Sequence, residues 1–190
     1  YDGSIDSALS SITADVSDYL KTPNSLSEYY PGFGWYGTIP SMSPTQGYML
    51  KVGVSSTLTY PNFGPNDYQS SSSDNDLSRL DLPASISNWE VDYHDYEFNG
   101  SITMSIDNRE DSDGDYIAVF VGNECRGVAK RMYFPFDDSY MYILMIYSNE
   151  LSGEDLTFKY YDSLQGEVVE YAETIEFSAD MVVGNGFKTF

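Results

Sequence analysis

Five carboxylates gather between positions 107 and 115, and they are the side chains of this chain best suited to hold a divalent cation. They are Asp107, Glu110, Asp111, Asp113 and Asp115. Calcium takes about six to eight oxygen ligands, and carboxylates on one loop can supply several of them. The loop is not an EF-hand, because Gly114 falls at the fourth place from Asp111 and Gly122 at the twelfth. The pattern predicts either a Ca²⁺ site or a solvated acidic turn, and Asp115 is the candidate ligand nearest to an apolar strand.

A group of aromatic residues in the first third of the chain is the best candidate for binding a ligand or a partner protein. Its members are Tyr30, Phe33, Trp35, Tyr36 and Tyr48. Aromatic faces together with phenolic hydroxyls can form a platform for a sugar or for a strand of another protein. The alternative is that these rings form the small core of a module with few aliphatic side chains. The sequence leaves both interpretations open.

The residues that could carry catalysis are few. His94 is the only histidine, so a Ser-His-Asp or Cys-His arrangement would have to include it, and no nucleophile-elbow motif accompanies it. Cys125 is the only cysteine, which excludes an intrachain disulfide, and one histidine with one distant cysteine makes no zinc ligand set. We therefore expect no enzymatic activity, with Cys125 buried as a small apolar side chain.

Two charged residues flank that cysteine, and strand alternation places them on the face opposite to it. They are Glu124 and Arg126. One interpretation is a surface ion pair with a neighbouring strand, and the other is that Arg126 acts as the counter-ion of the acidic loop.

The charge balance restricts the partners. The chain of 190 residues carries 30 acidic and 9 basic residues, a net charge of −21. Nucleic acids and anionic membranes bind proteins through Lys and Arg. A chain with so few basic residues and so many acidic ones is therefore not expected to bind either of them. No apolar run approaches the length of a membrane span, and we expect no membrane insertion. Cationic partners, divalent ions or a salty medium fit better, unless the charge simply keeps a secreted protein soluble.

The pattern along the chain predicts a mainly β fold: a small α+β module at 1–60, a Pro/Ser-rich linker at 61–88 and an antiparallel β-sandwich at 89–190. In the first module we expect a helix within 4–12, a short helix or turn at 25–29, and a hairpin of strands 47–52 and 57–60. In the linker, Leu77, Leu80 and Leu82 could attach the chain to a neighbouring surface.

Short strands with turn signals between them fill the last hundred residues. Alternation predicts a strand from Trp89 to Tyr93, and Asn99–Gly100 predicts a two-residue hairpin turn. The further strands that we expect are 116–121, 141–147, 156–161, 168–171 and 174–177.

Two segments carry a resemblance to known modules. The segment 32–52 (GFGWYGTIPSMSPTQGYMLKV) resembles a module in which a Gly-Trp turn leads to a "PGKGYML"-type strand, with Thr45 and Gln46 in place of Gly-Lys. The segment 114–129 (GDYIAVFVGNECRGVA) resembles a second module of the "FVG-x-ECRGVA" type. The pair resembles tandem β-modules of uncharacterised secreted or surface proteins of bacteria, many of which carry a C-terminal sorting domain. The resemblance implies an extracellular or cell-surface location and brings no catalytic residues.

From the sequence we expect a non-catalytic extracellular structural or adhesive module. One version of this expectation is a self-assembling subunit of a cell-surface fibre. Its partners would be other copies of itself or other surface proteins. The alternative is a carbohydrate-binding module of a larger secreted protein, with a polysaccharide as its ligand. No cofactor is certain, and Ca²⁺ is the one candidate.

Overall fold

A computed structural model describes residues 3–61, 80–107 and 112–190. Strands make up 45% and helices 8% of the described residues, which confirms the predicted mainly β class. The chain divides into two compact units, Tyr1–Asp76 and Leu77–Phe190, which are described separately below. Among the helices within the described ranges, none is long and apolar enough to cross a membrane.

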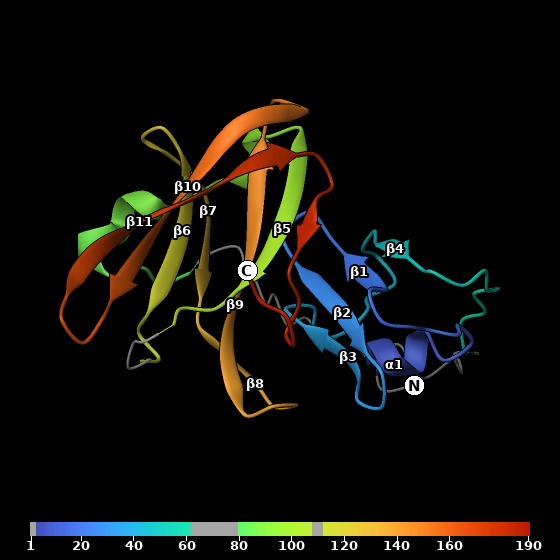
Figure 1. Cartoon of the computed structure of the whole chain (residues 1–190). Helices are drawn as coiled ribbons and strands as arrows, with labels where there is room; N and C mark the ends of the chain where they lie inside the picture. The colour runs from blue at the N-terminus through green and yellow to red at the C-terminus, as the bar shows by residue number, and fades with distance from the viewer. Residues whose placement is uncertain (1–2, 62–79, 108–111) are drawn as a thin grey trace. The chain divides into compact units, whose positions relative to one another are not determined.

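The first unit contains a one-turn helix and a four-stranded antiparallel sheet of order β3-β2-β1-β4, coloured blue to cyan in Figure 1. Its elements are α1 (Ile5–Ala8), β1 (Tyr19–Lys21), β2 (Leu26–Tyr30), β3 (Gly34–Gly37) and β4 (Met49–Lys51). The helix begins at Ser4, whose Oγ accepts a hydrogen bond from the Ser7 N–H at 3.2 Å. Ile5 and Ala8 of the helix then pack with Leu20 of β1 in one apolar cluster.

Two predictions for the first unit are wrong. The segment 25–29, expected to be a helix or turn, lies mostly in the strand β2, whose backbone pairs with β1 on one side and β3 on the other. The expected hairpin is absent as well, because β4 pairs with β1 and residues 57–60 form no strand. All four residues at 57–60 are exposed, so pairing there would bury no apolar face to stabilise it.

The second unit consists of two four-stranded sheets around one apolar core (Figure 1). Their orders are β11-β10-β6-β7 and β12-β5-β9-β8, and the β12–β5 pair is parallel while the others are antiparallel. The strands are β5 (Phe98–Met104), β6 (Tyr116–Val121), β7 (Glu124–Lys130), β8 (Met132–Phe134), β9 (Ser139–Ser148), β10 (Ser152–Asp162), β11 (Glu167–Ser178) and β12 (Val182–Val183). Ile102 and Leu144 from one sheet meet Ile117, Phe158 and Phe177 from the other.

A second apolar cluster covers the outer face of β6 and β7. The expected strand from Trp89 to Tyr93 is wrong, since Trp89 ends the 3-10 helix η1 (Ala84–Trp89), Tyr93 begins η2 (Tyr93–Asp95), and the residues between them form no strand. Ile86 and Trp89 are three residues apart, and both are buried against Phe120 of β6. Leu80 and Leu82 pack on the same cluster, as predicted for these leucines, and Leu77 lies outside the described residues.

Two glycines of this unit serve close packing. The expected turn at Asn99–Gly100 is wrong, because both residues lie inside β5, where a Cβ on Gly100 would come 2.6 Å from Cγ of Met181. A Cβ on Gly127 of β7 would collide with the carbonyl oxygen of Met145 on β9. Glycine at 127 therefore lets an edge strand of one sheet lie directly against a strand of the other.

Candidate functional sites

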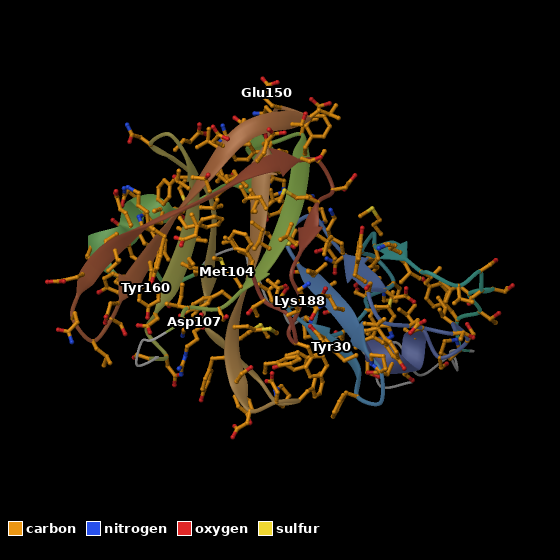
Figure 2. The ribbon with its side chains drawn as sticks, viewed as in Figure 1. Tyr30, Met104, Asp107, Glu150, Tyr160 and Lys188 are labelled. Atoms are coloured by element: carbon orange, nitrogen blue, oxygen red, sulfur yellow. The ribbon has the colours of Figure 1, made fainter. Side chains whose placement is uncertain are left out.

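Asp115, the residue just before β6, has the most extensively hydrogen-bonded carboxylate among the described residues of the second unit. Its side chain is fully buried. Oδ1 accepts hydrogen bonds from the N–H (2.9 Å) and Oγ–H (2.7 Å) of Ser163, and Oδ2 accepts from the hydroxyl of Tyr160 (2.6 Å) and the N–H of Ser112 (2.7 Å). Figure 2 labels Tyr160 on β10. The carboxylate thus joins the loop before β6 to the end of β10 and the turn after it.

These contacts fix the protonation states of both partners. Burial raises the pKa of Asp115. The hydrogen bonds from Tyr160, Ser163 and Ser112 together lower this pKa by more than burial raises it, so the net pKa lies below its usual value. Burial and the bond to Asp115 raise the pKa of Tyr160 well above its usual value. A carboxylate offers about four lone-pair sites, and the four protein donors occupy them. Asp115 therefore has no acceptor position left for a metal ion.

The other candidate metal ligands do not gather around Asp115. Asp107 is exposed on its turn (Figure 2), and Asp113 forms an ion pair with Arg131. Glu110 and Asp111 lie outside the described residues. Within the ranges that the structure describes, no three His, Cys, Asp or Glu side chains are close enough to hold a metal ion. The structure thus shows no common coordination site formed by Asp107, Asp113 and Asp115, although these residues are close in sequence.

The aromatic residues of the first unit divide between the two faces of its sheet. Trp35 and Tyr48 are half-buried against the cluster under α1. Tyr30 and Tyr36 lie on the opposite face by strand alternation, since Glu28 pairs with Tyr36 and precedes Tyr30 by two residues. Phe33 follows β2 and is 56% exposed. The five predicted binding residues therefore do not form one platform.

Tyr30 has a structural contact of its own. It is 3% exposed, and its hydroxyl donates to Oε2 of Glu28 at 3.0 Å. Burial raises the pKa of Glu28 to about 7, although this hydrogen bond lowers it. The ring of Tyr30 is thus inaccessible as a stacking surface for a ligand.

Arg126 is buried, which contradicts both interpretations of this residue from the sequence. Its Nη1 and Nη2 donate to Oε2 (3.2 Å) and Oε1 (3.0 Å) of Glu154 on β10, and Nη1 also donates to the carbonyl of Tyr147 at 3.2 Å. Glu124 remains 3.4 Å away at the surface. Cys125 packs with Trp89 and Phe120 on the outer face, whereas Arg126 contacts β9 of the other sheet, so the two side chains point apart as alternation predicts.

Cys125 is buried, as the sequence predicts. Its Sγ lies 3.3 Å from the carbonyl oxygen of Trp89, and burial raises its pKa to about 11. The side chain is therefore a neutral thiol at physiological pH, packed with the η1 cluster.

A row of stacked rings beside Arg126 is a surface feature that reasoning from the sequence missed. The ring centroid of Tyr147 lies 6.1 Å from that of Tyr93 and 6.0 Å from that of Tyr96, with interplanar angles of 30° and 25°. Tyr93 and Tyr96 are half-buried, and the Tyr96 hydroxyl donates to Glu124 at 2.7 Å. The guanidinium of Arg126 lies 5.2 Å from the ring centre of Tyr96. We call Tyr93, Tyr96 and Tyr147 the tyrosine row.

The lone histidine lies at one end of this row. The ring of His94 stacks on Tyr93, and its Nδ1 lies 2.8 Å from Oδ1 of the exposed Asp92. The pair is an exposed contact between His94 of η2 and the residue that precedes this helix.

No protein-family model, curated protein or solved structure matches this chain. The fold and the sites define it as a two-unit, mainly β protein whose best-connected buried charges, Asp115 and Arg126, bind other groups of the protein.

Proposed function

We propose that this chain is a non-catalytic, extracellular structural or adhesive module. The observation that carries the proposal concerns Asp115, the residue that the sequence favours as a Ca²⁺ ligand. Its carboxylate accepts four hydrogen bonds from other groups of the protein and so links the loop before β6 to β10. Arg126 and Glu154 make a second buried bridge, in which Nη1 and Nη2 are paired while Nε has no hydrogen-bond partner among the described residues. Buried polar groups with satisfied hydrogen bonds rigidify a core, which suits a module that bears load or presents a surface. The net charge of −21 fits a protein that works in salty surroundings.

Sedimentation velocity tests whether copies of this chain assemble into a fibre, which is one form of the proposal. We expect the mass to grow with protein concentration in high salt, because screening shortens the range of repulsion between copies of this charge. Parallel runs with and without millimolar Ca²⁺ determine whether the acidic loop contributes. A monomer at every concentration, salt level and Ca²⁺ level contradicts the fibre form.

Carbohydrate binding is the second candidate function, and the tyrosine row favours it. Tyr93 and Tyr96 present half-buried rings next to the carboxylate of Glu124, which combines apolar faces with a polar acceptor for sugar hydroxyls. On a glycan array, Tyr93→Ala should lose the binding of the wild type, whereas the control Tyr133→Ala, an exposed tyrosine on β8, should keep it. An array with no wild-type signal, or equal signals for both variants, contradicts this candidate.

A further inference from the structure

The strand β11 is a long sheet edge that no other strand of the described chain covers. It lies at the end of the order β11-β10-β6-β7 and pairs only with β10 (Figure 1). Its twelve residues, Glu167–Ser178, are mostly exposed, whereas Phe177 is buried in the core. A strand at this position presents a row of backbone N–H and C=O groups that an added strand could pair with.

Four glutamates make this edge acidic on both of its faces. They are Glu167, Glu170, Glu173 and Glu176, and all four are exposed. Pairing with β10 places Glu170 and Glu176 on the outer face of the sheet, and alternation directs Glu167 and Glu173 toward the other face. In the described chain, Lys159 is the one cation within ion-pair distance of any of them, and it contacts Glu170.

This charge pattern disfavours a second copy of the chain as the added strand. Two copies of β11 paired edge to edge would bring two rows of glutamates close together, and like charges near one another across a strand pair are destabilising. The register shift between Thr157 and Lys159 also makes β11 irregular near its middle. An added strand rich in lysine or arginine would instead meet a carboxylate on each face.

We propose that the outer edge of β11 binds an extended, basic segment of another protein by strand addition. The backbone of the segment pairs with β11, and its basic side chains contact the glutamates on both faces. Exposed Val168 and Thr174 lie on the outer face, so an apolar or β-branched residue of the segment can pack between the charged contacts. This inference rests on the adhesive function proposed above and names the chemistry of its partner.

Two synthetic peptides of equal length and equal positive charge test the proposal. One alternates lysine with valine and threonine, and the other has the same lysines with prolines in place of several β-branched residues, which prevents it from pairing as a strand. In fluorescence anisotropy we expect the strand-forming peptide to bind at least about tenfold more tightly than the proline peptide. Equal affinities, or no binding of either peptide, would overturn the proposal, because general attraction to an acidic protein does not distinguish the two.

Variants of the protein locate the site. Glu167→Gln/Glu173→Gln/Glu176→Gln should weaken binding of the strand-forming peptide roughly tenfold, since three cross-strand charge pairs are lost. The control Glu97→Gln/Asp107→Asn/Asp137→Asn removes the same charge from exposed positions elsewhere in the second unit and should change the affinity less than threefold. Equal weakening by both sets of substitutions would refute the assignment to β11.

Hydrogen exchange supplies a readout that does not depend on the affinity. Bound peptide should slow the exchange of additional amides within Glu167–Ser178, because the outward N–H groups of β11 gain partners. Protection confined to other strands would contradict the proposal. Such a result would leave the sedimentation test of the proposed function intact, since copies that assemble can do so through surfaces other than β11.

Discussion

Asp115→Asn is expected to lower the free energy of unfolding by about 2–4 kcal/mol. The asparagine amide keeps the shape of the carboxylate but replaces one accepting oxygen with a donor. Two of the four donors from Ser112, Tyr160 and Ser163 then face an N–H₂ group inside the protein. Urea denaturation of the wild type and the variant at neutral pH measures the difference.

Asp107→Asn is the matched control for this substitution. Asp107 belongs to the same acidic stretch and is exposed, so its replacement should leave the urea midpoint nearly unchanged. If Asp115 were a calcium ligand, its substitution would act mainly when Ca²⁺ is present. We expect the same loss of stability with Ca²⁺ and with a chelator, and a loss seen only with Ca²⁺ contradicts the structural role.

The hydrogen bonds of Asp115 also determine how the effect of Asp115→Asn on stability depends on pH. The pKa of Asp115 is lowered in the folded protein, so its stabilising contribution is present above the unfolded pKa of about 3.9 and is lost as the pH falls through the lower folded pKa. The difference between wild type and Asp115→Asn should therefore shrink in acid. The raised pKa of Tyr160 has the opposite consequence, and its contribution decreases as the pH rises above about 10.

Glu154→Ala is expected to destabilise the second unit by about 3 kcal/mol. The substitution leaves Arg126, whose side chain is 10% exposed, without its bidentate counter-ion beside the carbonyl of Tyr147. Glu124, 3.4 Å from Arg126, compensates for part of the loss. Denaturation monitored by tyrosine and tryptophan fluorescence gives the unfolding free energy.

Substitutions around the same pair separate the buried ion pair from the surface charge. Glu124→Gln removes a carboxylate that is 60% exposed, and it should change stability by about 0–1 kcal/mol. Arg126→Met/Glu154→Leu removes both charges, and it should be less destabilising than Glu154→Ala because no buried charge is left unpaired. Equal losses for Glu124→Gln and Glu154→Ala would contradict the assignment of Glu154 as the main partner.

Local sequence patterns predicted the strands with the strongest apolar character. The runs at 116–121, 141–147 and 156–161 lie within β6, β9 and β10, because long apolar or alternating segments bury one face or both faces in any sheet. Asn99–Gly100 has the composition of a turn, yet its glycine serves to admit Met181. Trp89 alternates with polar neighbours as in a strand, but it is the end of a 3-10 helix that packs on Phe120. Tertiary packing decided both cases.

The candidate sites were harder to predict, because their contacts join distant segments. The hydroxyl of Tyr160 and the backbone of Ser163 lie 45 and 48 residues beyond Asp115, and Glu154 lies 28 residues beyond Arg126. A window of residues around Asp115 shows only neighbouring carboxylates, and it therefore suggests a metal site. The N–H of Ser112 is a local donor, but only the arrangement of β6 and β10 brings the three donors of Tyr160 and Ser163 to this carboxylate.

Nuclear magnetic resonance of the Asp115 network during a Ca²⁺ titration tests most directly whether this carboxylate serves the fold. The signals to follow are the amide protons of Ser112 and Ser163 and the hydroxyl proton of Tyr160, each of which donates to Asp115. We expect all three to keep their chemical shifts up to millimolar Ca²⁺, because protein donors already occupy the carboxylate. Saturable shifts that disappear in Asp115→Asn would show instead that calcium takes their place.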